Sequence, residues 1–289
     1  MSDSKPLPLK KRVFINSPPS GCPHLLAKAI EIWGYEDYAI SNNYVAGTPK
    51  SFNYKQSKNS LEQLQTSTSS QKNNEKIGLG GLSPYFVDSS IVKYWLDRVA
   101  NGQYILGHIP RSPALTKVLA ELDYIHLLVM SNPQSLVVSM LSFILDEKRA
   151  VKHFLQDDFK LMSPRERLSF ILSGGYASKA GVEVESFAEI YRSMLTWNQE
   201  PSCFLVSLED LICQPGGATL EKQKGVMTEI ANYLGEPLYE DMVERLREIE
   251  VSTASVFKIG AWQNLIDPEI SDRLVEYCEP LCEETGYNI

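Results

Sequence analysis

The chain has 289 residues, enough for one large α/β domain or for two smaller ones. Hydrophobic residues make up 43% and charged residues 22%, as in an ordinary globular protein. The formal net charge of −8 argues against a nucleic acid as partner, because contacts with phosphates require clustered lysine and arginine side chains.

The sequence shows no targeting signal. The first 12 residues lack the apolar segment of a secretory signal peptide, and no apolar run approaches the roughly 20 residues of a membrane helix. The five cysteines fit neither a zinc site nor a disulfide framework, because their number is odd and their spacing irregular. We therefore expect a cytoplasmic protein with reduced thiols, no bound metal and no membrane contact. The oligomeric state stays open.

The first predicted unit is a strand, a turn and a helix. Residues 12–17 form an apolar run that ends at two prolines, Pro18 and Pro19, which predicts a buried strand entering a tight turn at residues 20–23. Residues 25–33 have apolar side chains at helical spacing, and Gly34 ends the pattern. Such a turn directs backbone N–H groups toward a ligand at the helix start, which suits a phosphate.

A polar segment follows this unit. Residues 51–76 consist mainly of Gln, Ser, Asn, Lys and Thr, which cannot build a core. We expect a mobile polar loop at about residues 47–84. Long loops in compact domains often serve as lids or binding loops, and a disordered insertion without function is the alternative.

Three further apolar runs predict strands, at residues 104–109, 124–130 and 203–207. Segments with helical character lie between and after them, at residues 113–122, 133–152, 164–174, 184–197, 219–234, 238–249 and 268–285. This alternation predicts one α/β domain over residues 1–289, with a central parallel sheet of four to five strands covered by helices on both faces.

The candidate site residues follow the predicted strands, because ligands of open parallel sheets bind beyond the carboxyl ends of the strands. His108 ends a strand in a Gly-His-x-Pro turn, and we interpret it as a general base for an acceptor hydroxyl or amine, with a structural role as the alternative. Ser131 stands where it can cap the next helix, whereas Ser139 lies too far inside that helix to cap it. His126 and His153 are interpreted as structural.

Five segments in the right order resemble the motifs of the cytosolic-type sulfotransferases, and together they span nearly the whole chain. Their counterparts in the family are the 5′-phosphosulfate loop (residues 17–24), the catalytic Lys-Thr-His-x-Pro segment (107–110, GHIP), the 3′-phosphate segment (129–139), the Tyr-Glu-Asp-Leu strand end (204–215) and the carboxyl-terminal Gly-Lys-x-Gly-Asp-Trp segment with its later Gly-Tyr (257–287).

The resemblance implies a P-loop sulfotransferase-like fold and a transferase reaction. The donor would be 3′-phosphoadenosine 5′-phosphosulfate (PAPS), and the partner a small-molecule acceptor with a hydroxyl or amine, as in natural-product tailoring. His108 would be the catalytic base, without a metal. The donor-binding residues implied are Ser20, Gly21, Cys22, Pro23, His24, Ser131, Ser139 and Trp262. A packing role is the alternative for the tryptophan.

The family's donor-binding cations are missing from these segments. The phosphate-loop lysine of the family is replaced by Pro19 or Ser20, and the lysine before the histidine is replaced by Leu106. The 3′-phosphate arginine is replaced by Ser131, and the family's Arg-Lys-Gly is replaced by residues 255–257. A charge-assisted hydrogen bond is worth roughly 1.5–3 kcal/mol, so losing three would cost about 5–9 kcal/mol. The candidate substitutes are Lys28, Arg111 and Lys258.

Two other functions are therefore kept beside the transferase. One is a sulfotransferase-fold protein whose donor site has been lost or repurposed, as a non-catalytic binding module or for different chemistry. The other is a P-loop NTPase, which the sequence disfavours because Gly-x4-Gly-Lys-Ser/Thr is absent.

Overall fold

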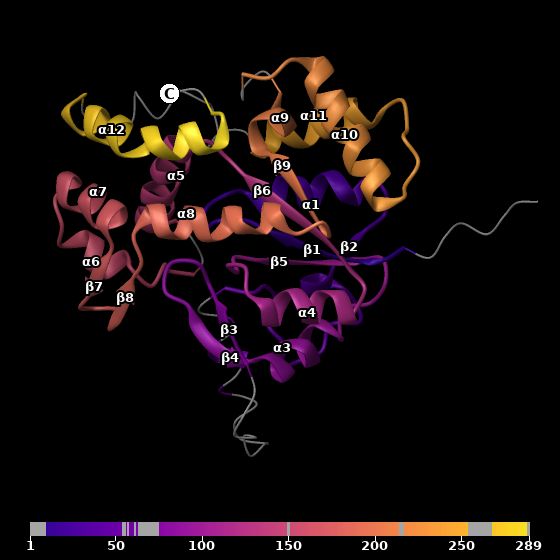
Figure 1. The fold of residues 1–289 in the computed structure, drawn as a ribbon, viewed down its shortest axis with the longest axis horizontal. Coiled ribbons are helices and arrows are strands. Elements are labelled where there is room, and N and C mark those ends of the chain that lie inside the picture. The colour runs from indigo at the N-terminus through magenta and orange to yellow at the C-terminus, as the bar shows by residue number, and fades with distance from the viewer. Residues whose placement is uncertain are drawn as a thin grey trace, which may run out of the picture.

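The centre of the fold is a five-stranded parallel sheet. The computed structural model describes residues 10–53, 56, 58–60, 62, 75–148, 151–213, 217–253 and 268–287. The strand order is β2-β5-β1-β6-β9, and every pairing is parallel (Figure 1). The strands are β1 (Arg12–Asn16), β2 (Glu36–Asp37), β5 (Gln103–Gly107), β6 (Tyr124–Met130) and β9 (Cys203–Ser207). The predicted fold class is confirmed, and the edge strand β2 is the one that the sequence did not reveal.

Helices cover both faces of the sheet (Figure 1). One face packs against α1 (Pro23–Glu31), α9 (Leu208–Ile212), α10 (Leu220–Leu234) and α11 (Met242–Thr253). The other face packs against α3 (Ser89–Leu96), α4 (Pro113–Glu121), α5 (Pro133–Leu145), α6 (Gln156–Lys160), α7 (Pro164–Ser173), α8 (Phe187–Leu195) and α12 (Pro268–Thr285).

Side chains at alternate positions of a strand pack into two separate hydrophobic cores, one on each face of the sheet. In β1, Val13 and Ile15 belong to the cluster under α1, whereas Phe14 belongs to the opposite cluster under α5 and α8. All three side chains are fully buried. Burial on both faces explains why the strands are continuous apolar runs rather than alternating ones.

Two short antiparallel hairpins escaped the sequence prediction. They are β3 (Lys76–Leu79) with β4 (Tyr85–Asp88), and β7 (Gly175–Ala177) with β8 (Val182–Val184). The first begins inside the segment predicted as a mobile loop at about 47–84, and that prediction is wrong for residues 76–79. The reason is packing, because Ile77 and Leu79 are fully buried in the core. A lid role for the rest of the segment stays a prediction.

Helix α5 is shorter than predicted. It ends at Leu145, and Asp146 leaves helical geometry with a ψ of 105°. The Asp146 carboxylate accepts a hydrogen bond from the backbone N–H of Lys148 at 2.9 Å. Aspartate competes with helical bonding in this way, and it turns the chain back toward the sheet edge. Residues 151 and 152 therefore lie outside the helix in which the sequence placed them.

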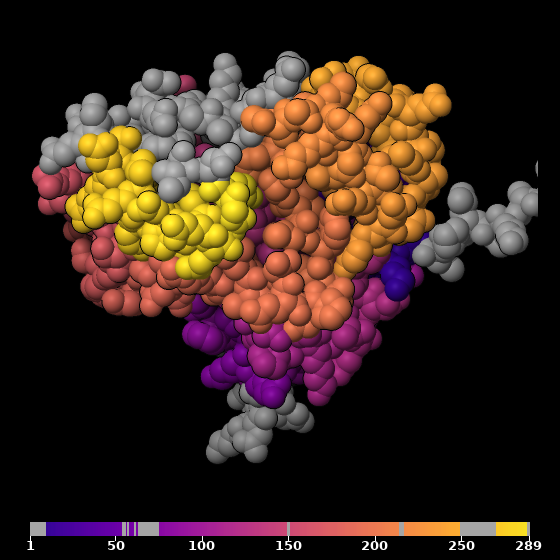
Figure 2. Space-filling model, turned by 45° about the horizontal axis from the view of Figure 1, so that its top comes forward, coloured from indigo at the N-terminus to yellow at the C-terminus, as the bar shows by residue number. Residues whose placement is uncertain are grey.

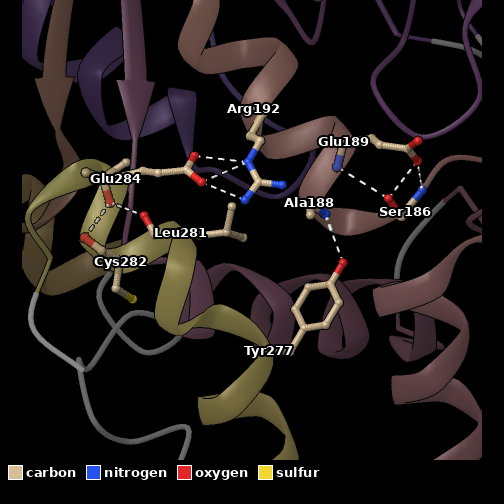
Figure 3. Close-up of polar contacts among 9 residues, drawn as sticks. Ser186, Ala188, Glu189, Arg192, Tyr277, Leu281, Cys282 and Glu284 are labelled. Carbon is tan, nitrogen blue, oxygen red and sulfur yellow. Dashed lines mark hydrogen bonds and ion pairs between the residues drawn. The ribbon is translucent and has the colours of Figure 1, made fainter.

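Polar contacts join the C-terminal helix α12 to α8 (Figure 3), and one further hydrogen bond joins it to α7. Nε and Nη2 of Arg192 donate to the Glu284 carboxylate at 3.0 and 2.6 Å. The Tyr277 hydroxyl accepts from the Ala188 N–H at 3.2 Å and donates to the Leu172 carbonyl at 2.6 Å. These contacts bring the end of the chain to the carboxyl edge of the sheet, beside β9.

The thiols of the chain, and the helices and polar clusters of its described part, have the following properties. All five cysteines are free thiols in the structure. Among the described residues, no helix is both long and apolar enough to cross a membrane. The same residues contain no group of His, Cys, Asp and Glu side chains arranged to hold a metal ion.

Candidate active site

The turn after β1 is tight and strained. Ser20 and Cys22 lie in the left-handed region, with φ of 65° and 53°, which costs free energy for residues other than glycine. The Gly21 N–H donates to the Pro18 carbonyl at 2.9 Å. A Cβ on Gly21 would lie 2.9 Å from that same oxygen, so the turn excludes any larger residue there. The predicted turn between β1 and α1 is confirmed, with Pro23 as first residue of the helix.

His108 lies at the end of β5, directly beside this turn. Its Nδ1 is 2.9 Å from the carbonyl oxygen of Ser17 and 3.3 Å from the Ser17 hydroxyl. A carbonyl oxygen only accepts, so Nδ1 carries the proton of the neutral ring and Nε2 has the lone pair. Burial lowers the pKa of His108 below its ordinary value of 6.5, and the nearby His24 lowers it further, against hydrogen bonds with Ser17 and Pro18. At neutral pH this imidazole is therefore a base with its lone pair on a known atom.

Ser139 is tied to the turn from the other side. Its hydroxyl donates to the Ser20 carbonyl at 3.2 Å, across 119 positions in the sequence. The hydrogen bond holds α5 against the turn, so that Ser139 and the residues from Ser20 to His24 are brought together as predicted. It also commits the serine hydrogen to protein in this structure.

The turn and His108 line one cavity of about 320 Å³. We call it the histidine cavity. Its lining consists of Pro19, Ser20, Asn53, Gln56, Gly80, Gly81, Leu82, His108, Phe143, Val151, Lys152, His153 and Phe154. Small-molecule sites in proteins typically measure about 300–1,000 Å³, so this one suits a small ligand.

The remaining predicted residues lie elsewhere. Lys28 is exposed and forms an ion pair with Glu31 at 2.7 Å, three residues on in α1, and Arg111 is paired with Glu200. Neither lines the histidine cavity. Lys258 and Trp262 lie outside the described residues.

Ser131 is buried, and its carbonyl accepts from the Tyr191 hydroxyl at 2.9 Å. The interpretation of Ser131 as a helix cap is wrong, because Asn132 is the N-cap of α5. The Asn132 side chain accepts from the backbone N–H groups of Gln134 and Ser135, at 2.9 and 3.2 Å. An asparagine is as good a cap as a serine, and the Ser-Asn pair left both possible.

A second recess lies at the carboxyl ends of β6 and β9, with a volume of about 600 Å³. Figure 2 shows it between the yellow atoms of α12 and the orange atoms around α9 and α10. We call it the carboxylate recess, because Glu209, Asp210 and Glu284 line it. Burial raises the pKa of Glu209 above its ordinary 4.5, against hydrogen bonds from Asn132, Ser207 and Tyr287.

Sequence reasoning missed most residues of the histidine cavity, among them Phe143, Lys152, His153 and Phe154. The sequence pattern placed 133–152 in one helix, which hid the return of the chain after Asp146. The pair Asp146-Glu147, followed by charged residues, is the signal that could have shown the early end. Lys152 is the only lysine or arginine among the described residues that line this cavity.

Among the comparisons with known proteins, one solved structure supports the fold. No family model matches the chain, and no curated protein matches its sequence. The structure of mouse sulfotransferase SULT7A1 complexed with PAP is similar over 92% of this chain and 82% of that chain, with a TM-score of 0.53 and 15% identity. Retinol dehydratase, in complex with androsterone and the inactive cofactor PAP, matches over 98% and 84%, with a TM-score of 0.48 and 12% identity.

The first of these similarities shows that this chain has the sulfotransferase fold. The resemblance seen in the sequence is thereby confirmed at the level of the fold. At 15% identity the likeness carries no residue roles from one chain to the other.

Proposed function

We propose that this protein is a sulfotransferase, which moves a sulfuryl group from PAPS to a hydroxyl or amine of a small molecule. The observation that carries the proposal is the placement of His108. Its Nδ1–H is held by the Ser17 carbonyl, and its ring lines the same cavity as the Ser20 turn. A base thus stands next to a helix start that suits a phosphosulfate group.

In the proposed reaction, His108 takes the acceptor's proton on Nε2 while the acceptor oxygen or nitrogen forms a bond to sulfur. The bond between sulfur and the phosphate oxygen breaks, and its electron pair leaves with 3′-phosphoadenosine 5′-phosphate (PAP). The Ser17 carbonyl becomes the partner that stabilises the imidazolium through Nδ1–H. The turn would hold the leaving phosphate by backbone N–H groups.

The described residues fit the two halves of this donor unequally. The turn would offer backbone N–H groups to the phosphosulfate half, although the Gly21 N–H is given to Pro18 and Pro23 has none. Ser131, however, is 3% exposed, and the Ser139 hydrogen is given to Ser20, so the 3′-phosphate half has less support. This favours a second candidate, a sulfotransferase-fold protein whose donor site has been repurposed. The expectations of a cytoplasmic enzyme and of natural-product tailoring stay predictions.

Calorimetric titration with PAP separates the two candidates without knowledge of the acceptor. We expect saturable binding in the micromolar range for the transferase, and the absence of heat at millimolar PAP would reject it. Gly21→Ala should weaken binding by tenfold or more, on the order of 1.4 kcal/mol, because the new Cβ meets the Pro18 carbonyl. The matched control is Gly225→Ala in α10, where a Cβ meets nothing within 4 Å. The control should leave PAP affinity unchanged.

A further inference from the structure

Asn16, the last residue of β1, is fully buried, and its side chain is paired with the backbone of Ile109. Its Oδ1 accepts from the Ile109 N–H at 2.9 Å, and its Nδ2 donates to the Ile109 carbonyl at 2.8 Å. These partners fix the orientation of the amide, because an N–H group only donates and a carbonyl oxygen only accepts. Ile109 directly follows His108, so the two-pronged contact holds the segment that carries the histidine.

The other edge of this segment shows how a regular parallel pairing is made. Phe52 forms a parallel bridge with Gly107. The Phe52 N–H donates to the Leu106 carbonyl at 2.8 Å, and the Phe52 carbonyl accepts from the His108 N–H at 3.0 Å. In a parallel bridge, one residue is thus joined to the two neighbours of its partner by one donated and one accepted bond.

On the β1 side the same pattern stops after its first bond. The Ser17 N–H donates to the Gly107 carbonyl at 3.2 Å, and the regular second bond would run from the Ile109 N–H to the Ser17 carbonyl. Instead, the Ile109 N–H donates to Oδ1 of Asn16. The Ser17 carbonyl accepts from Nδ1 of His108 at 2.9 Å. The Asn16 side chain therefore replaces a backbone acceptor, and the acceptor that it spares holds the histidine ring.

The bond to the Ile109 N–H is the more important of the two that Asn16 makes. The Ile109 carbonyl has a second donor, because Nε1 of Trp197 lies 2.9 Å from it. The carbonyl would thus stay paired without Asn16, whereas the N–H would have to find another acceptor. The nearest regular one is the Ser17 carbonyl, which His108 uses.

We propose that Asn16 is a positioning residue that sets the tautomer of His108. By accepting from the Ile109 N–H it leaves the Ser17 carbonyl to the Nδ1–H of the histidine, so that the lone pair stands on Nε2. Asn16 does not line the histidine cavity, so it acts through His108 rather than on a ligand. The consequence for catalysis rests on the proposed function, in which Nε2 takes the proton of the acceptor.

The test identifies the protonated nitrogen of His108 by long-range ¹H–¹⁵N correlation spectra of the full chain, without donor or acceptor. Spectra are recorded at alkaline pH, where the imidazole is neutral, and the His108 signals are those absent in His108→Ala. We expect the proton on Nδ1 in the wild-type protein. In Asn16→Ala the ratio of the Nδ1–H form to the Nε2–H form should fall by about two- to tenfold, the factor for one neutral hydrogen bond.

Asn16→Asp separates positioning from a merely structural role. It keeps the acceptor oxygen for the Ile109 N–H but buries a carboxyl group, so the free energy of unfolding in urea should fall. The tautomer ratio should nevertheless stay within about twofold of the wild-type value. The matched control is Tyr124→Phe, which removes a buried hydrogen bond to the Leu96 carbonyl at the amino end of β6 and should leave the ratio unchanged.

Four results would overturn the proposal. They are a wild-type ring protonated on Nε2, an unchanged ratio in Asn16→Ala, equal losses in Asn16→Ala and Tyr124→Phe, and a loss in Asn16→Asp as large as in Asn16→Ala. If Asn16→Ala does not fold, Asn16→Ser takes its place, because its hydroxyl is one bond shorter than the amide and reaches the Ile109 N–H poorly. The same fall in the ratio is expected for it.

Titration with PAP on the same preparations keeps the two proposals apart. If PAP binds and Asn16→Ala leaves the tautomer unchanged, the positioning role is wrong and the transferase stands. If the variants show the expected pattern and PAP does not bind, Asn16 orients His108 in a protein that is no PAPS-dependent enzyme. If both proposals hold, formation of PAP from PAPS should fall in Asn16→Ala by about two- to tenfold, in step with the tautomer ratio.

Discussion

The histidine cavity and the carboxylate recess lie at the same edge of one sheet, but they use their polar groups differently. In the recess the carboxylates are engaged with protein: Glu209 accepts from the Asn132 N–H at 2.7 Å, and Asp210 pairs with Lys222 at 2.8 Å. In the cavity, protein contacts fix one nitrogen of His108 and one of His153. The second nitrogen of the His108 ring, Nε2, is the atom that the proposed reaction requires.

The difference indicates which region meets the reacting end of an anionic donor. A phosphosulfate placed in the recess would meet Glu209, Asp210 and Glu284, and the cations beside the last two, Lys222 and Arg192, are already engaged with those carboxylates. The cavity instead offers the turn, two histidines and Lys152. We therefore expect substitutions in the cavity to change activity and substitutions around the recess to change stability.

The largest effect is expected for His108→Ala. A general base contributes about 10²- to 10⁴-fold to a rate, so formation of PAP from PAPS with a hydroxyl or amine acceptor should fall by that factor. PAP affinity should stay within about twofold, because the base contacts the acceptor rather than the nucleotide. An alanine variant with wild-type turnover would remove His108 from the mechanism.

Glu209→Ala tests the recess side of the comparison. It leaves the buried N–H of Asn132 without its acceptor, which should lower the free energy of unfolding by about 1–3 kcal/mol. Glu209→Gln keeps an acceptor oxygen at this position and should cost less. Urea denaturation measures both. A large loss of turnover in Glu209→Gln at unchanged stability would contradict the structural role.

His126, a buried histidine on the central strand β6, allows a test of stability that is independent of both cavities. Its ring lies 4.3 Å from that of Trp197 and 5.2 Å from that of Phe14, and its Nε2 has no hydrogen-bond partner among the described residues. Burial lowers the pKa of His126 from 6.5 to about 3. The unfolded chain therefore binds a proton below pH 6.5 that the folded chain does not bind, and stability is lost as the pH falls through this window.

The expected loss is about 1.4 kcal/mol per pH unit, or about 2 kcal/mol between pH 6.5 and 5. His126→Leu should remove this part of the acid sensitivity. Unfolding free energies of both proteins at pH 8, 6.5 and 5 separate it from packing changes, which act equally at all three values. Parallel pH curves for the two proteins would show that His126 titrates as freely in the folded chain as in the unfolded one.

The sequence was a good guide to the elements with long apolar patterns and a poor one to the site. The strands at residues 124–130 and 203–207 agree with the structure at both ends, because each is an unbroken apolar run, even though the edge strand β9 is only partly buried. The strand β3 (Lys76–Leu79) has only two buried apolar side chains, Ile77 and Leu79, and this pattern is too short to recognise in the sequence. His108 and the Ser20 turn were found because they follow strands.

The other half of the site depends on where a helix ends. Asp146 ends α5 through a side-chain contact with Lys148, and this contact sends His153 to the cavity. Helical periodicity continues past that point in the sequence, so the pattern gave His153 a structural role. Local competition between one aspartate and the helix thus helped to place His153 in the lining of the cavity.

The smallest effect is expected at the contact that holds α12 over the recess. Arg192 and Glu284 form a two-pronged ion pair (Figure 3), but their side chains are 49% and 42% exposed. Exposed pairs contribute about 0–1 kcal/mol, so Arg192→Gln should lower the free energy of unfolding by less than about 1 kcal/mol, and less again at high salt. Tyr277→Phe, which removes a hydroxyl with two backbone partners, should cost more than Arg192→Gln. The reverse order would mean that α12 is fastened by charge rather than by its half-buried hydrogen bonds, and that salt controls access to the recess.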